Sequence, residues 1–168
     1  MSDRGSYLPT GLPTPVPEND GLDKPYWEAA RRGELVVQRC KACGTFQWGP
    51  EWICHKCLSF DLDWHKVSGK GRIYSWERPW HPVHPALKGH GPYVVVLVEL
   101  PDAGNVRMLG NLLGDPKQEV RIGAEVEAVR QLRGQSTSQV RDADVSMVIS
   151  GPMVTPVSSM IMGSEATL

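Results

Sequence analysis

Alternating apolar and polar residues divide the middle of the chain into short strands. The clearest run, residues 93–100, is almost continuously apolar, which predicts a strand buried on both faces. Alternation and β-branched or aromatic residues predict further strands. These lie at residues 34–39, 61–67, 72–77, 106–113 and 125–131. Gly-containing stretches at 68–71 and 101–105 predict turns between them. The five strands from residue 61 onward lie within about seventy residues, a spacing typical of a small barrel or sandwich.

One short helix is predicted ahead of the strands, at residues 23–32. Asp23 is a suitable N-cap, Pro25 suits the first turn, and Gly33 is a natural stop. The strand at 34–39 follows directly, so the helix and the first strand should form one compact unit.

Both ends of the chain have a different pattern. Residues 1–22 are rich in Pro and Gly, which predicts an extended arm. Residues 134–143 have the composition of a linker, and residues 145–162 contain no charge. Pro and Gly at 151–156 divide this last stretch into two apolar strands with a kinked connection. Such strands aggregate when exposed, so we expect them to be buried in the chain's own barrel or in a partner.

The overall composition fits one domain, or one domain with a small module, in 168 residues. The net charge of −1 argues against broad electrostatic capture of nucleic acid or an anionic membrane. No apolar run reaches the length of a membrane span, and the first twenty residues lack the apolar core of a secretory signal. We therefore expect a cytoplasmic protein. In that reducing compartment, clustered cysteines are metal ligands more often than disulfides.

All four cysteines lie within residues 40–57, as the C-x-x-C pairs Cys40/Cys43 and Cys54/Cys57. Two such turns, ten residues apart, can close a tetrahedral sulfur site, which predicts structural zinc. Iron in the same sulfur cage is the main alternative. Four thiolates leave no open position for water or substrate, so the metal would stabilise the fold and perform no chemistry.

Several motifs follow one another over residues 23–130: PYWEAARRGELVVQRCKACG, the second C-x-x-C pair, LSFDLDWHKVSGKGRIYSWERPWHP, GPYVVVLVELPDAGNVRMLGNL and VRIGAEVEAV. Together they resemble the zinc-ribbon/OB-fold proteins that accompany thiolase-superfamily enzymes. The resemblance implies a short helix, a rubredoxin-like zinc ribbon and a five-stranded OB-fold barrel. It also implies an accessory subunit whose thiolase-like partner condenses or cleaves acyl-CoA.

Two features depart from the family pattern. Where members often have Pro-Pro-Arg between the cysteine pairs, this chain has residues 48–51, WGPE, so a basic contact there is not expected. The tail VSMVISGPMVTPVSSMIMGS resembles the closing strand pair of thiolase-like aldolases, which favours an aldolase partner. Exposed apolar residues of the ribbon and the tail would then dock the partner. The candidates are Trp48, Trp52, Met147, Ile149, Met160 and Ile161.

The loop at residues 77–93 contains the other candidate chemistry. Its histidine, basic and aromatic residues are Trp80, His81, His84, Lys88, His90 and Tyr93. Acid–base catalysis or a second metal site would need such histidines, but only Glu77 lies near enough in sequence to orient an imidazole. We assign no catalytic residue. The loop is either an ordered surface loop or a contact for the partner or acyl-CoA, whose adenine and phosphates suit these side chains.

Taken together, the sequence predicts a mainly β chain in four segments. Residues 1–22 form an extended arm, and 23–66 form the helix and zinc ribbon. Residues 67–133 form the OB-fold barrel, and 134–168 form a linker and a hairpin-like, partner-docking tail. We expect a non-catalytic subunit of a retro-aldolase that acts on a CoA thioester, for example the CoA thioester of a steroid side chain. We expect no nucleic-acid or membrane partner.

Two alternatives to this function stay open. The partner could be a thiolase-like acyltransferase or synthase, because only the tail favours an aldolase. The chain could instead bind single-stranded nucleic acid, as OB-folds commonly do, with Tyr74, Trp76 and Trp80 as stacking platforms. A basic groove is what the sequence lacks for that role: residues 24–66 hold seven Lys or Arg and five Asp or Glu, and four thiolates with a divalent metal add about two negative charges.

Overall fold

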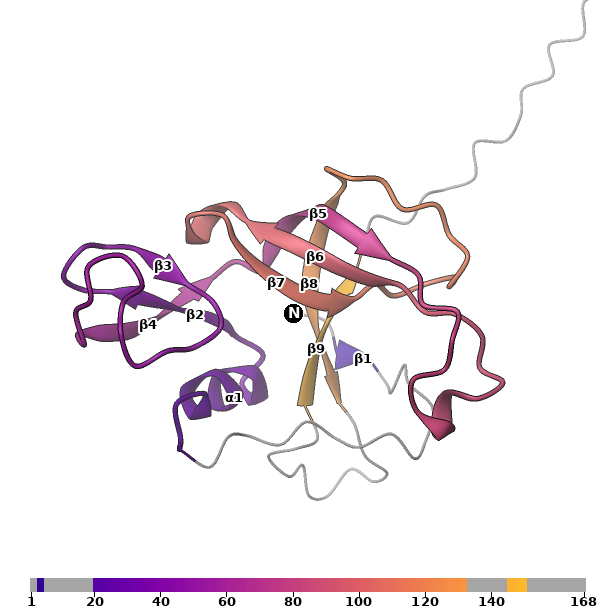
Figure 1. The fold of residues 1–168 in the computed structure, drawn as a ribbon, viewed down its shortest axis with the longest axis horizontal. Coiled ribbons are helices and arrows are strands. Elements are labelled where there is room, and N and C mark those ends of the chain that lie inside the picture. Colours follow the sequence, from indigo (N-terminus) through magenta and orange to yellow (C-terminus); the bar gives the residue numbers. More distant parts are fainter. Residues whose placement is uncertain (1–2, 5–19, 133–144, 151–168) are drawn as a thin grey trace, which may run out of the picture.

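The computed structural model describes residues 3–4, 20–132 and 145–150, which are mainly β with one short α-helix (Figure 1). A small module of helix and ribbon lies beside a curled antiparallel sheet. No helix in these residues is long and apolar enough to cross a membrane.

The predicted helix is confirmed as α1 (Lys24–Arg31). Pro25 stands in its first turn, and Gly33 follows with a φ of +76°. The Asp23 carboxylate accepts a 2.6 Å hydrogen bond from the Trp27 indole, which closes the first turn with a side-chain contact. The buried face of α1 packs on the ribbon and the barrel.

The ribbon sheet has the order β3-β2-β4, with all pairs antiparallel. It consists of β2 (Leu35–Cys40), β3 (Phe46–Gln47) and β4 (Leu62–Val67). The strand spacing counts β4 toward the five strands that suggest a barrel, whereas the predicted segment 23–66 places most of it with the ribbon, and it pairs with β2 along its whole length. The strand therefore belongs to the metal module.

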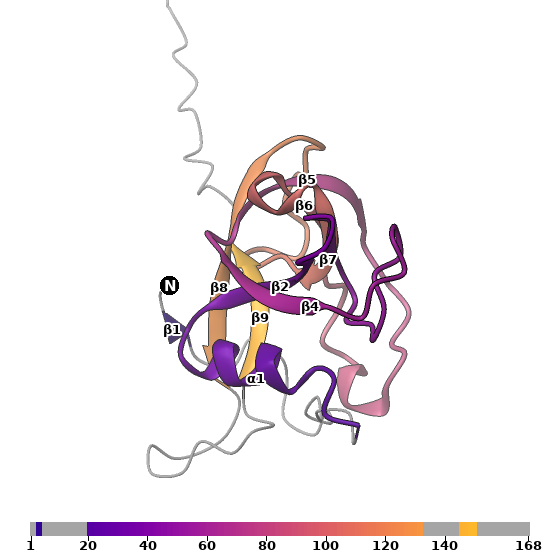
Figure 2. The same ribbon diagram turned by 90° about the vertical axis from the view of Figure 1, so that its left-hand side faces the viewer.

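The second sheet curls into a half-barrel of the OB-fold type (Figure 2). Its antiparallel strands are, in pairing order, β7 (Val106–Asn111), β6 (Val95–Leu100), β5 (Lys70–Glu77), β8 (Glu125–Leu132) and β9 (Val145–Ser150). β9 also lies beside β7 and α1. The short β1 (Asp3–Arg4) pairs in parallel with the end of β8.

The first half of the apolar tail forms a strand, β9, in the chain's own sheet. Its backbone pairs with β8 from Val145 opposite Leu132 to Ser150 opposite Glu127. Residues 145–150 are thus the fifth antiparallel strand of the chain's own sheet. The predicted docking residues Met147 and Ile149 lie in this strand, and their docking role stays a prediction. Met160, Ile161, the linker and the second half of the tail lie outside the described residues.

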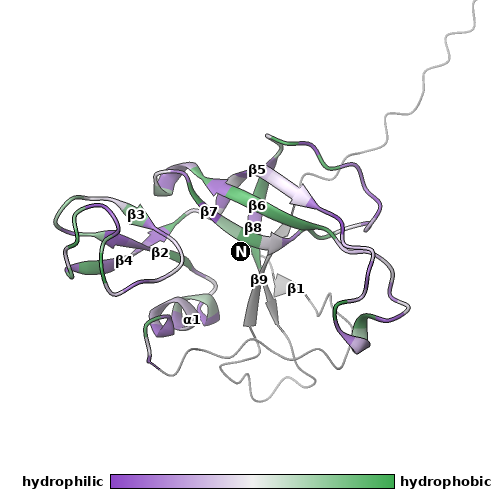
Figure 3. Cartoon of the chain, viewed as in Figure 1, coloured by the Kyte–Doolittle hydropathy of each residue, from purple (hydrophilic) through white to green (hydrophobic). Residues whose placement is uncertain are grey.

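β6 differs from the expectation of burial on both faces. Val96, Val98 and Leu100 are buried, whereas the residues between them are only half-buried. The apolar stripe along this strand is visible in Figure 3. The expectation was wrong for the outer face, because an antiparallel sheet needs cover on one side only.

The predicted turn at residues 68–71 is shorter than expected, because β5 already begins at Lys70. A Cβ on Gly71 would lie 2.4 Å from Val98 Cγ1 and 2.6 Å from the Glu99 carbonyl oxygen. This glycine therefore serves the close approach of two strands. One hydrophobic core, with Tyr26, Val37 and Val96 among its residues, extends through α1, β2 and the barrel. The ribbon is consequently fixed on the barrel.

Candidate metal centre and ligand loop

The first cysteine turn follows directly from β2. Cys40 donates its N–H to the Thr45 carbonyl at 2.8 Å and accepts at its carbonyl from the Gly44 N–H at 2.8 Å. Gly44 has a φ of +74°, the left-handed conformation that closes such a turn. These bonds direct Cys40 and Cys43 toward one point.

The second turn repeats this geometry with a different residue at the critical position. Cys54 donates to the Ser59 carbonyl at 2.9 Å and accepts from the Leu58 N–H at 3.0 Å. Leu58 occupies the position that Gly44 has in the first turn, and its φ is +60°. Sequence reasoning missed this left-handed leucine, although the offset after the C-x-x-C pair marks it.

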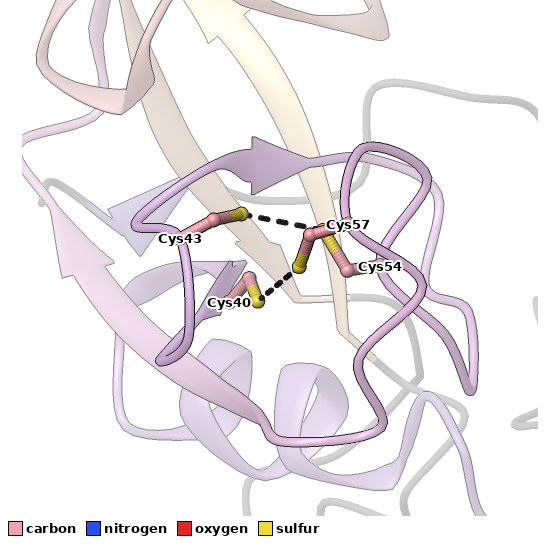
Figure 4. A group of neighbouring side chains, drawn as sticks. All are labelled: Cys40, Cys43, Cys54 and Cys57. Atoms are coloured by element: carbon pink, nitrogen blue, oxygen red, sulfur yellow. Dashed lines mark hydrogen bonds between the residues drawn. The ribbon is translucent and has the colours of Figure 1, made fainter.

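The four sulfur atoms form a compact cluster (Figure 4). They all lie within 4.8 Å of one another, with 3.6 Å between the Sγ atoms of Cys40 and Cys57 and 3.7 Å between those of Cys43 and Cys54. A Zn–S distance of about 2.3 Å in a tetrahedron implies sulfur separations of about 3.8 Å. The donor set and its spacing therefore fit a zinc ion, as the sequence predicts.

The thiols of the cluster differ in pKa. The hydrogen bond with the Thr45 hydroxyl lowers the pKa of Cys43 to about 6. A bond from the Ser59 backbone lowers the pKa of Cys57, but the three neighbouring thiols, with Cys43 first, and desolvation outweigh it and raise that pKa to about 12. The cluster thus resists holding several negative charges without a compensating cation.

Two side-chain amides hold the segment that leads to the second turn. Gln38 of β2 and Gln47 of β3 are 3% and 4% exposed and form a cross-strand pair. Their amides bind backbone groups of residues 51–55. Sequence reasoning missed both residues, whose signal is a polar side chain at a buried position of a strand.

The two tryptophans predicted to dock a partner are in different environments. Trp48 is half-buried, and its ring centroid lies 4.9 Å from that of Tyr26 in α1. Trp52 is 59% exposed. Only Trp52 offers most of its surface to a partner, whereas Trp48 joins the ribbon to the helix.

The histidine loop is anchored by its middle. Leu87, in the 3₁₀ turn Pro85–Leu87, is buried, and His84 Nδ1 accepts a hydrogen bond from the Ala86 N–H at 3.1 Å. Tyr93 is half-buried at the far end of the loop. The remaining candidates are exposed: Trp80, His81, Lys88 and His90. Within the described residues, the only cluster able to hold a metal is that of the four cysteines.

The aromatic residues of β5 are partly covered by arginines. The Arg107 guanidinium carbon lies 3.5 Å from the centroid of the Tyr74 ring, and Arg107 also bonds the Glu99 carboxylate at 2.9 Å. Arg78 stacks on Trp76 at 5.1 Å. One face of each ring is therefore already occupied, which leaves less room for stacked bases.

Fold and site together define a zinc-ribbon/OB-fold protein. The model of a rubredoxin-like zinc ribbon domain of ChsH2 matches residues 27–63, and the model of the C-terminal OB-fold domain of ChsH2 matches residues 64–131. The chain belongs to this ChsH2 family of zinc-ribbon and OB-fold proteins.

The similar proteins differ in length and name. A probable enoyl-CoA hydratase alpha subunit of Thermomonospora curvata is 42% identical over 105 residues, which are 62% of this chain and 32% of the relative. A DUF35 domain-containing scaffold protein of Methanocaldococcus jannaschii is 35% identical over 99 residues, 56% of this chain and 66% of the relative. The chain thus spans about a third of the first relative and just under two thirds of the second.

Among solved structures, the chain is similar to a chain of the "Ltp2-ChsH2(DUF35) aldolase". The identity is 32% and the TM-score is 0.64, and the match covers 82% of this chain and 98% of that one. The similarity therefore extends over both modules.

Proposed function

We propose that this chain is a non-catalytic accessory subunit of a thiolase-superfamily complex that acts on acyl-CoA. The metal site supports the non-catalytic role, because four thiolates saturate a tetrahedral ion and leave it no position for substrate. The described residues outside the cluster hold exposed histidines without a carboxylate partner that orients them. The reacting groups would then belong to the partner.

The observation that supports the partner class most strongly is the match to nearly the whole of one chain in a structure named as an aldolase. The scaffold name of the archaeal relative points to the same kind of role. We infer that the partner performs retro-aldol cleavage of a CoA thioester, with a steroid side chain as the substrate class that the family resemblance favours.

A co-expression experiment tests this proposal against the acyltransferase alternative. The chain would be co-expressed with thiolase-like proteins from the same genome, and the purified complex given a β-hydroxyacyl-CoA. Retro-aldol cleavage breaks the Cα–Cβ bond, turns the hydroxyl into a carbonyl and returns the proton to Cα, so no free CoA thiol appears. An acyltransferase given a second acyl-CoA as acceptor moves the acyl group from the CoA sulfur to the acceptor carbon and releases that thiol, which a thiol reagent detects. Failure of any thiolase-like protein to co-purify would contradict both versions.

The exposed part of the histidine loop is the proposed acyl-CoA contact. Lys88 and His90 suit phosphates, and Trp80 suits an adenine ring. The double substitution of Lys88 and His90 by Ala should raise the KM for acyl-CoA several-fold, while His65→Ala, an exposed histidine on β4, should not. Unchanged KM values in the double variant would remove the loop from the binding site. His84 is not used in this test, because its side chain supports the loop's own backbone.

A further inference from the structure

The two glutamines beneath the metal site form a closed hydrogen-bond network. Gln38 Oε1 accepts from the Glu51 N–H at 2.9 Å, and Gln38 Nε2 donates to the Glu51 carbonyl at 3.1 Å. Gln47 Nε2 donates to the Ile53 carbonyl at 3.2 Å, and Gln47 Oε1 accepts from the His55 N–H at 3.2 Å. A fifth bond, 3.0 Å long, joins Gln47 Nε2 to Gln38 Oε1.

These bonds replace a strand partner for the segment that delivers the second cysteine turn. Residues 48–53 contain no helix or strand, yet they lead directly to Cys54. Each glutamine amide binds one N–H and one C=O within residues 51–55, as a neighbouring strand would. The binding groups lie on both sides of Cys54, since Ile53 precedes it and His55 follows it.

Burial gives the network its strength. Gln38 and Gln47 are the only buried amide side chains among residues 20–129. A buried amide that loses its partner costs about 1–3 kcal/mol, so each glutamine enforces one position of the backbone it binds. None of the five bonds involves a sulfur atom, so the network can exist whether or not a metal is bound.

We propose that Gln38 and Gln47 are positioning residues of the metal centre, which hold the Cys54/Cys57 turn in its ligating geometry before the ion arrives. The first turn needs no such help, because Cys40 ends a strand and its register is fixed by β4. The second turn is tied to β2 at its far end through β4 and the bond from the Lys41 N–H to the Asp61 carbonyl, whereas the two amides hold the end at which the chain enters it. Part of the zinc affinity should therefore reside in these side chains.

The test compares substitutions that keep volume and remove hydrogen bonds. Gln47→Met has nearly the same length and shape but loses its three bonds. In the full chain, zinc affinity measured by competition with a chelator should fall about 10- to 100-fold, the range for residues that orient metal ligands. Bound Co²⁺ should show shifted or weakened visible bands, because its thiolate geometry is less regular.

Val36→Ala is the matched control. Val36 lies in the hydrophobic core, in β2, which contains Gln38 and pairs with the strand of Gln47, and its truncation destabilises the sheet without removing a bond to residues 51–55. If Gln47→Met binds zinc no more weakly than Val36→Ala at a similar loss of melting temperature, the proposal is overturned.

A second measurement addresses the metal-free chain directly. The amide protons of Glu51 and His55 should stay protected from exchange after zinc is removed, and that of His55, whose acceptor is Gln47 Oε1, should exchange rapidly in Gln47→Met. Free exchange of both in the metal-depleted wild type would show that the glutamines do not order the turn in advance.

Should Gln47→Met fail to fold, Gln38→Met decides, since it leaves the Ile53 and His55 bonds intact. Its zinc affinity should fall less, but still below that of Val36→Ala, and wild-type affinity would refute the proposal.

Discussion

At the scale of single residues, the two cysteine turns both need a left-handed residue four positions after their first cysteine, but they differ in backbone strain. Gly44 adopts its φ of +74° without a side chain to hinder it. Leu58 adopts a φ of +60° with a branched side chain that is 67% exposed and gains little from burial. The left-handed region costs an L-residue roughly 1–2 kcal/mol, so the second turn contains strain that the first lacks.

Leu58→Gly should therefore stabilise the zinc-loaded protein. The relief of backbone strain exceeds the entropy that glycine adds to the unfolded chain, roughly 0.5–1 kcal/mol, so we expect a net gain of about 0.5–1 kcal/mol. A thermal melt of the zinc-loaded chain measures it. Ala42→Gly, in the first turn at an ordinary φ, is the control and should lower the melting temperature. A lower melting temperature for Leu58→Gly would show that its side chain makes a contact worth more than the strain.

The unequal thiols predict how zinc binding depends on pH. Near pH 7, Cys43 is largely a thiolate because its pKa is about 6, whereas Cys57, with a pKa of about 12, holds its proton. Zinc binds thiolates, so it must displace that proton. Calorimetric titrations in buffers of different ionisation enthalpy should show the release of at least one proton per zinc, and affinity should fall as the pH is lowered. An enthalpy independent of the buffer would contradict this.

At the scale of secondary-structure elements, local signals located most of the fold. Asp23, Pro25 and Gly33 marked the ends of the helix because terminus and turn preferences act within a few residues, although the Asp23 carboxylate binds the Trp27 indole and does not cap the helix backbone. The cysteine spacing located the metal site for the same reason. The assignment of strands to sheets was only partly predictable, because the pattern of a strand does not show which other strand it pairs with: β4 pairs with β2 of the ribbon and β9 with β8 of the barrel.

Contacts between strands also explain why the sequence did not predict the two buried glutamines at the metal site. Gln38 and Gln47 have no motif, and their importance follows from burial opposite each other in two strands. The loop histidines were recognised as a group, but only the folded chain distinguishes His84, which supports the loop, from its exposed neighbours. The residue types in the loop show which groups could bind a ligand, and the packing of the folded chain decides which of these side chains are free to do so.

The pairing of β9 with β8 predicts different results for two truncations. A chain that ends at Ser150 keeps the fifth strand, whereas a chain that ends at Leu132 loses a six-residue ladder. At about 0.5–1.5 kcal/mol for each hydrogen bond, the shorter chain should lose roughly 3 kcal/mol or more of folding stability. Urea unfolding followed by tryptophan fluorescence compares the two. Equal stability of the two chains would mean that β9 does not stabilise the barrel.

At the scale of the whole molecule, the shared core makes the ribbon a rigid extension of the barrel. Side chains of α1, β2 and the barrel strands pack in a single cluster, so the two modules should not move independently. A partner that binds the ribbon is thereby held in a fixed position relative to the histidine loop. This arrangement suits a subunit that aligns a neighbour's active site without contributing to its chemistry.

The two ribbon tryptophans allow docking to be separated from folding. Trp52→Ser removes a 59% exposed side chain, so the melting temperature of the chain should hardly change, while affinity for the co-expressed thiolase-like partner should fall by about 2 kcal/mol or more if Trp52 fills a pocket there. Trp48→Ser is the matched control. Its ring packs on Tyr26, so we expect a lower melting temperature in the isolated chain. Analytical ultracentrifugation of the mixed proteins gives the affinities. Wild-type assembly by Trp52→Ser would move the docking surface away from the ribbon, to the barrel and its tail.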